Sequence, residues 1–292
     1  MVENRRILIP GSEWLYFKIY VGIKTSDDLI IGTISPFVSD FLDNEIISSY
    51  FFIRYIDKGY HIRLRLHLKD KSYFNYVLEM FSQKFGPLIE KGIISDVEIG
   101  TYRRELERYG FYTTELVEEL FFYDSQIILA IIDYIHHNNS KEIVRVISAF
   151  CLIDYILNGF GYCLDDKVDL MSKLSKNFFS EFGFNSNKYT GVLNKKFREY
   201  RKDLEHSFDY APDFFTDITT DYKMRTQSIS EKIMENASKD KNINKNNLLG
   251  SIIHMSMNRL FQSNNRIYEL IIYYFIEKIY KSKKALESIK ST

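Results

Sequence analysis

The period of the hydrophobic pattern changes near residue 113 of this 292-residue chain. Before that point, aromatic and β-branched runs such as 13–22 alternate with helix-like stretches, a pattern typical of strands separated by helices. After it, apolar residues recur about every 3.6 positions, which predicts helices. Helices are expected at 113–137, 140–160, 188–208, 224–239, 246–262 and 265–284. The pattern predicts an α+β fold, in which a small antiparallel or mixed sheet with helices is followed by a larger helical part that shares one site with it.

The composition is that of a chain that can fold around its own core, with 45% hydrophobic and 27% charged residues. We expect a single domain over 1–292, with an α/β-rich part at 1–112 and a helical part at 113–292. The 39 basic residues balance the 39 acidic ones. Because no net positive charge draws the chain to a polyanion, we expect no direct binding of tRNA.

Several classes of protein are disfavoured by what the sequence lacks. Its two cysteines, Cys151 and Cys163, are too few for a disulfide framework or a zinc site. It contains no phosphate-binding glycine loop, dinucleotide fingerprint, nucleophile elbow or paired-histidine metal motif. We therefore expect neither a metal nor a cofactor. The N-terminus has no signal-peptide pattern and the apolar runs are short, so we expect a cytoplasmic protein that does not bind membranes.

Residues 50–68 form the most informative segment, because two apolar strands flank a glycine-containing turn and yet carry several arginines. A two-residue turn at Lys58 and Gly59 would give the hairpin one wholly apolar face. The other face would carry Arg54, His61, Arg63 and Arg65, with Arg54 opposite Arg63. Directly opposed like charges destabilise a sheet by up to about 1 kcal/mol. We therefore expect a negative partner at this face, either a carboxylate such as Glu105 or Glu107 or an anionic ligand.

Two later segments also carry residues suited to chemistry. Residues 101–110 place Arg104 and Arg108 among glutamates and end at Tyr109 and Gly110, which alone could be a salt-bridged turn. Residues 251–260 form an apolar helix stripe with His254 and Asn258 at i and i+4, on one face. A histidine on such a helix is more often a satisfied core residue than a catalytic one.

The three segments in this order, FFIRYID–GYHIRLRL, YRRELERYG and IHMSMNRL, resemble a known family. It is the C-terminal elimination domain of class I lantibiotic dehydratases (the SpaB-C type), also called the thiopeptide-type bacteriocin biosynthesis domain. WLYFKIY and ELFFYDS fit the same pattern. The resemblance implies elimination of glutamate from glutamylated Ser or Thr of a precursor peptide, giving dehydroalanine or dehydrobutyrine. Because the chain starts almost at the first strand of this domain, we expect an elimination subunit that works with a separate glutamylating subunit.

The resemblance also implies roles for individual residues. Arg63 and Arg65 match the hairpin arginines of the family, and either Arg104 or Arg108 matches the arginine of its ERYGG segment. These arginines would bind the glutamyl carboxylates and the developing enolate, and His254 would transfer the proton. Expected contacts to the substrate come from Arg54, His61, Tyr109 and Asn258. This chain has Phe111 where the family has its second glycine, so the turn and the choice between Arg104 and Arg108 stay open.

Two other functions are weighed against elimination. The same fold occurs in the cycloaddition enzymes of thiopeptide assembly, which join two dehydroalanines into a six-membered ring. Such an enzyme need not bind glutamate, so the retained arginines favour elimination. A non-catalytic subunit that binds the peptide is the third possibility, and loss of the arginines or of His254 would have favoured it.

Overall fold

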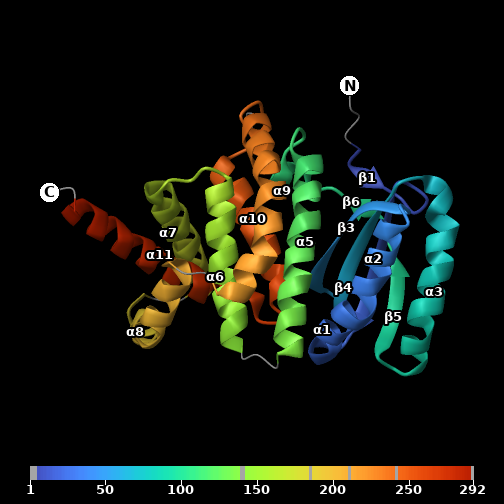
Figure 1. Ribbon diagram of the computed structural model, residues 1–292, viewed down its shortest axis with the longest axis horizontal. Helices are drawn as coiled ribbons and strands as arrows, with labels where there is room; N and C mark the ends of the chain where they lie inside the picture. Colours follow the sequence, from blue (N-terminus) through green and yellow to red (C-terminus); the bar gives the residue numbers. More distant parts are fainter. Residues whose placement is uncertain (1–4, 139–141, 184–185, 210–211, 241–242, 291–292) are drawn as a thin grey trace.

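The sheet lies at one end of the protein and the long helices at the other in the computed structural model, which describes residues 5–138, 142–183, 186–209, 212–240 and 243–290 (Figure 1). Four antiparallel strands have the order β3-β4-β2-β5. They are β2 (Trp14–Val21), β3 (Ile47–Ile56), β4 (Tyr60–Leu68) and β5 (Ile94–Ile99). A small second sheet pairs β1 (Ile7–Leu8) with β6 (Tyr102–Arg103).

Helices connect the strands and cover one face of the sheet. They are α1 (Ser26–Leu29), a π-helical turn (Ile30–Ile34), α2 (Ser35–Asp43), α3 (Phe74–Glu90) and the short α4 (Leu106–Tyr109), with single 3₁₀ turns at Ile23–Thr25 and Lys71–Tyr73. Phe81 of α3 stacks on Phe17 of β2, with ring centroids 4.1 Å apart. Phe37 of α2 meets the ring of Phe81 edge-on. This aromatic layer seals the face of the sheet that carries the apolar residues of β2 and β4.

The helical part follows Thr113, and the predicted α+β fold is confirmed. Its helices are α5 (Thr114–His137), α6 (Glu142–Gly159), α7 (Leu164–Glu181), α8 (Ser186–Asp209), α9 (Asp213–Ala237), α10 (Lys245–Leu260) and α11 (Asn265–Lys290). The hydrophobic period did not predict α7, a polar helix with a capping box formed by Cys163 and Asp166. No helix in the described part of the chain is long and apolar enough to cross a bilayer.

The hairpin register differs from the predicted one by one residue. Its loop has three residues, 57–59, so Ile56 pairs with Tyr60 and Arg54 pairs with Ile62. Because side chains alternate between the two faces of a strand, a register shift of one residue changes which residues of the two strands share a face. Arg63 therefore lies across from Ile53, and Arg54 points to the opposite face of the sheet. The predicted opposition of Arg54 and Arg63 was wrong, because the turn is one residue longer than assumed.

The outer edge of β3 is covered by the helical part. The backbone N–H of Phe52 donates to the hydroxyl of Ser125 in α5 over 3.4 Å, and that of Arg54 donates to the side-chain oxygen of Asn258 in α10 over 2.9 Å. Two donors that would otherwise be exposed at a sheet edge are thus paired.

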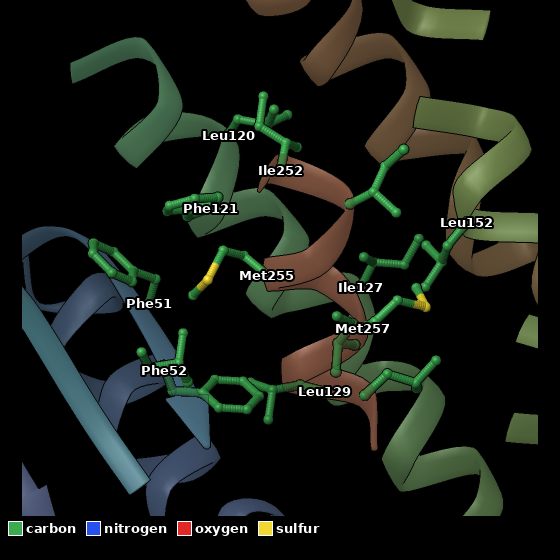
Figure 2. Close-up of a cluster of buried hydrophobic side chains, with 14 of the residues drawn as sticks. Phe51, Phe52, Leu120, Phe121, Ile127, Leu129, Leu152, Ile252, Met255 and Met257 are labelled. Atoms are coloured by element: carbon green, nitrogen blue, oxygen red, sulfur yellow. The ribbon is translucent and has the colours of Figure 1, made fainter. Parts of the chain in front are cut away.

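One hydrophobic core joins the two parts. Figure 2 shows Phe51 and Phe52 of β3 packing towards Phe121 of α5 and Met255 of α10. Side chains of the sheet and of α10 are therefore held at fixed positions relative to one another, as a shared site requires.

Candidate active site

His254 is held by a buried carboxylate. Its Nδ1 lies 2.9 Å from both carboxylate oxygens of Glu269, a residue of α11 with no exposed surface. Tyr273, one turn further along α11, donates its hydroxyl to the same carboxylate over 3.0 Å. A carboxylate only accepts hydrogen bonds, so Nδ1 carries the hydrogen and Nε2 keeps a free lone pair. The His254 side chain is 25% exposed, so that lone pair can meet a ligand.

Three cationic side chains line the pocket in front of His254. It has a volume of about 270 Å³, and Arg108, Lys173 and Arg266 line it together with His254 and Glu269. The guanidinium of Arg266 lies 4.1 Å from the ring centre of Phe178 and pairs with Glu181. This combination of cations and an imidazole suits a substrate that carries a carboxylate.

Arg108 reaches this pocket because of the turn around α4. The helix has only four residues and ends at Gly110, whose φ of +82° is accessible to glycine at little cost. A Cβ at that position would come within 2.5 Å of the Thr113 hydroxyl. Phe111 has no positive φ, so this turn needs one glycine and not two. Arg108 bonds to Glu105 over 3.1 Å and stays partly exposed.

Two further arginines, which do not line the pocket, have unused hydrogen-bond donors. Arg65 is buried against the rings of Tyr16, Phe51 and Tyr102, at 4.7, 5.1 and 4.7 Å, and its Nε has no hydrogen-bond partner among the described residues. Arg259 of α10, whose guanidinium lies 6.0 Å from the same Phe51 ring, is fully buried, and its Nε and Nη2 also lack partners there.

Arg259 makes one ion pair, from Nη1 to Asp124 over 2.9 Å. Burial raises the pKa of Asp124, although the guanidinium opposes this shift, and burial lowers the pKa of Arg259. Removal from water thus penalises both charges. Arg65 and Arg259 thus keep unused donors in a buried region, and these donors can hydrogen-bond an additional anion.

Tyr109 lies beside this cluster. It is buried, meets Phe121 edge-on at 5.5 Å, and burial raises the pKa of its hydroxyl to about 12. The phenol is therefore protonated near neutral pH and can donate a hydrogen bond.

Arg104 lies away from the pocket in a buried ion pair. Its Nε and Nη2 donate to the two carboxylate oxygens of Glu118 over 2.8 and 2.7 Å. Tyr102 donates its hydroxyl to the same carboxylate over 2.6 Å. Of the two arginines that the sequence left open, Arg108 is the one that lines the pocket of His254.

Arg54 is also fully engaged inside the protein. Its Nη2 bonds to Asp27 over 2.5 Å, its Nη1 to Ser26 over 2.8 Å, and its Nε to the carbonyl of Arg259 over 2.9 Å. Asp27 also accepts from Arg145 of α6 over 2.8 Å. This network ties the sheet to the end of α10.

The rest of the arginine row lies near the hairpin turn. Arg63 covers the ring of Tyr55, 3.4 Å from its centre, and its Nε donates to Nε2 of His61 over 3.1 Å. His61 is buried, and burial lowers the pKa of its imidazole, against the effect of the neighbouring Asp57. A carboxylate does lie beside the row, Asp57 at 3.6 Å from Arg63, whereas the suggested Glu105 and Glu107 pair with Arg108 and Arg6 instead.

Glu269 and Arg259 were not predicted from the sequence. Glu269 lies on the next helix, 15 residues after His254, within an apolar run. Its only signal was a carboxylate on a helix face that is otherwise apolar. Arg259 stands inside the quoted IHMSMNRL segment, and its burial was not apparent from the helical period.

The fold places an imidazole–carboxylate pair and three cationic side chains around one pocket between helices α4, α7, α10 and α11. The chain belongs to the family of lantibiotic biosynthesis dehydratase C-terminal domains, which matches residues 14–280.

Among known proteins, the nisin biosynthesis protein NisB of Lactococcus lactis subsp. lactis is 28% identical over 287 residues. These residues are 97% of this chain and 27% of NisB, so the chain spans about a quarter of the length of that relative.

Solved structures share the fold. MibB, a tRNA-dependent lantibiotic dehydratase from Microbispora sp. 107891, matches 91% of this chain and 28% of its own with a TM-score of 0.72 and 17% identity. TbtD, the pyridine synthase of thiomuracin biosynthesis, matches 93% of this chain and 98% of its own with a TM-score of 0.66 and 11% identity.

Proposed function

We propose that this chain eliminates glutamate from glutamylated Ser or Thr residues of a ribosomal precursor peptide. The supporting observation is that His254, backed by Glu269, shares a pocket with Arg108. Membership of a dehydratase family fits this reaction class.

The reaction needs a base and a stabilised leaving group. Hydroxide leaves poorly, since its conjugate acid has a pKa near 15.7, whereas the carboxyl group of glutamate has a pKa near 4.3. In the ester, the remaining difficulty is the weakly acidic Cα proton. A base removes that proton, the C–H electrons form the Cα=Cβ bond, and the Cβ–O bond breaks to release glutamate as a carboxylate.

His254 is the proposed base. Its Nδ1 is bonded to Glu269, which leaves Nε2 as the basic nitrogen, and the carboxylate would stabilise the imidazolium that forms. The proton then leaves to water or to the departing glutamate.

The arginines are the proposed anion-binding groups. Arg108 would hold the glutamyl carboxylate in the pocket. Arg65, with its unpaired Nε, would stabilise the enolate that develops on the carbonyl of the modified residue. Arg63 would orient the hairpin, while Tyr109, His61 and Asn258 would contact the peptide. We propose that Arg54 and Arg104 act only by holding the fold, because both are already bonded to carboxylates.

A glutamylating subunit must make the ester, and we propose that it passes the ester on within a complex. Docking would raise the effective concentration of a labile ester. The balanced charge of the chain supports the absence of its own tRNA binding, which a gel-shift titration with glutamyl-tRNA would test. A shift at micromolar protein would contradict it.

A second candidate is cycloaddition, favoured by the likeness to TbtD over nearly its whole length. One experiment separates the two reactions. The protein is incubated with a synthetic glutamyl-serine peptide and, separately, with a peptide that carries two dehydroalanines. The masses of the products are measured by mass spectrometry. Elimination predicts loss of glutamate from the first and no change in the second, and His254→Ala should abolish the loss. Ring formation in the second peptide without any loss from the first would replace the elimination proposal.

A further inference from the structure

A second groove starts at His254 and runs away from the cationic pocket. It has a volume of about 410 Å³ and lies between the end of β3 and the start of α11. His254 and Arg266 line both the pocket and this groove, so the two cavities border the same imidazole.

The walls of this second groove are apolar and open to solvent. They include Tyr55, Ile56, Phe182 and Ile267. Ile56 is 64% exposed and Ile267 is 49% exposed, although both are large aliphatic residues. Exposed apolar side chains gathered around a concave surface mark a place where another molecule binds.

Asn258 adds a polar group at a fixed position in this groove. Its side-chain oxygen accepts the backbone N–H of Arg54, which directs the carboxamide NH₂ the other way. That NH₂ has no partner among the residues that the structure describes, so it can donate to a backbone carbonyl of a bound peptide.

We propose that this second groove binds an apolar side chain of the residue adjacent to the glutamylated one, and so selects the sequence context of modification. The inference rests on the proposed function in taking a modified peptide as the substrate. A peptide must continue on both sides of its reacting residue, and His254 stands where the pocket and the groove meet. The charged glutamyl group fits the side with Arg108 and Lys173, whereas an apolar neighbour fits the side with Ile56 and Ile267.

The test measures binding without turnover. The probes are fluorescent hexapeptides in which 2,3-diaminopropionate carries glutamate as a stable amide in place of the ester. The residue before or after it is Leu or Ser. Fluorescence anisotropy should show that Leu on one side lowers the Kd about tenfold. Ile56→Ser and Ile267→Ser should each reduce this preference to about twofold or less.

Two matched variants serve as controls. Ile99→Ser changes another exposed isoleucine, on the other edge strand, and Leu286→Ser changes an exposed leucine near the far end of α11. Both should keep the tenfold preference. Equal Kd values for Leu and Ser peptides in the wild type, or an unchanged preference in the groove variants, would overturn the inference.

A parallel elimination assay keeps the two proposals apart. With a glutamyl-serine peptide flanked by serines, both groove variants should eliminate at the wild-type rate. If the wild type shows the Leu preference but eliminates nothing, the reaction proposal fails and the groove assignment stands. If it eliminates normally without any Leu preference, only the groove assignment fails.

Discussion

Replacing Glu269 by Gln tests whether the carboxylate behind His254 takes part in the reaction. The substitution keeps the size of the side chain, and the Gln oxygen can still accept from Nδ1 of His254 over about the same distance. It removes the negative charge that would face the imidazolium after proton transfer. Folding and peptide binding should therefore change little, while the proton-transfer step slows.

The size of the effect follows from the geometry. Unit charges about 4 Å apart attract by about 4 kcal/mol at an effective dielectric constant of 20. Water reaches part of the imidazole, since the His254 side chain is 25% exposed, and recovers some of that energy. We expect a loss of about 2–3 kcal/mol in transition-state stabilisation, which is about 30- to 150-fold in kcat.

The assay is single-turnover elimination from a glutamyl-serine peptide, quenched at intervals and followed by mass spectrometry. Glu277→Gln is the control, because Glu277 lies on the same helix, is nearly buried and bonds to Lys281 over 2.5 Å, but does not line the pocket. The control should keep at least half of the wild-type rate. A loss below threefold in a folded Glu269→Gln protein, or an equal loss in Glu277→Gln, would refute a catalytic part for the dyad.

Three more predictions concern other parts of the protein. Arg108→Ala should slow elimination about 10²- to 10³-fold with an unchanged melting temperature. Arg104→Ala should instead lower the free energy of unfolding by about 3–5 kcal/mol. The reverse pattern in activity and melting assays would exchange the roles of the two arginines. Burial raises the pKa of the Cys151 thiol to about 12, so iodoacetamide at pH 8 should label only the exposed Cys163 in the native protein. Labelling of both cysteines before the protein unfolds would contradict the structure. A hydrogen bond from Lys18 lowers the pKa of Glu98, so the pair stabilises the fold above the unfolded pKa of the carboxyl group, and this stabilisation is lost as pH falls through the folded pKa. In Glu98→Gln, the free energy of unfolding measured with urea should fall less steeply with pH below about pH 5, and an unchanged slope would count against the pair.

The sequence motifs identified the family and supplied the candidate site residues, and the limits of this prediction have physical reasons. His254 and Arg108 were recognised from local patterns in their own segments, because each stands in a short motif. Arg104 could not be separated from Arg108, because the two are four residues apart among the same glutamates. Only the position of Glu118, on another helix, places Arg104 in a buried ion pair.

The sequence by itself determined most of the helices and strands, because hydrophobic period is a local property of the chain, but it did not predict the polar helix α7. It did not determine the hairpin register, since one residue more in the turn moves Arg54 to the other face of the sheet. It also did not reveal that Glu269 stands behind His254, or that Ile56 and Ile267 line one groove. Those contacts join segments from different elements, and only the packing of α10 and α11 against the sheet brings them together.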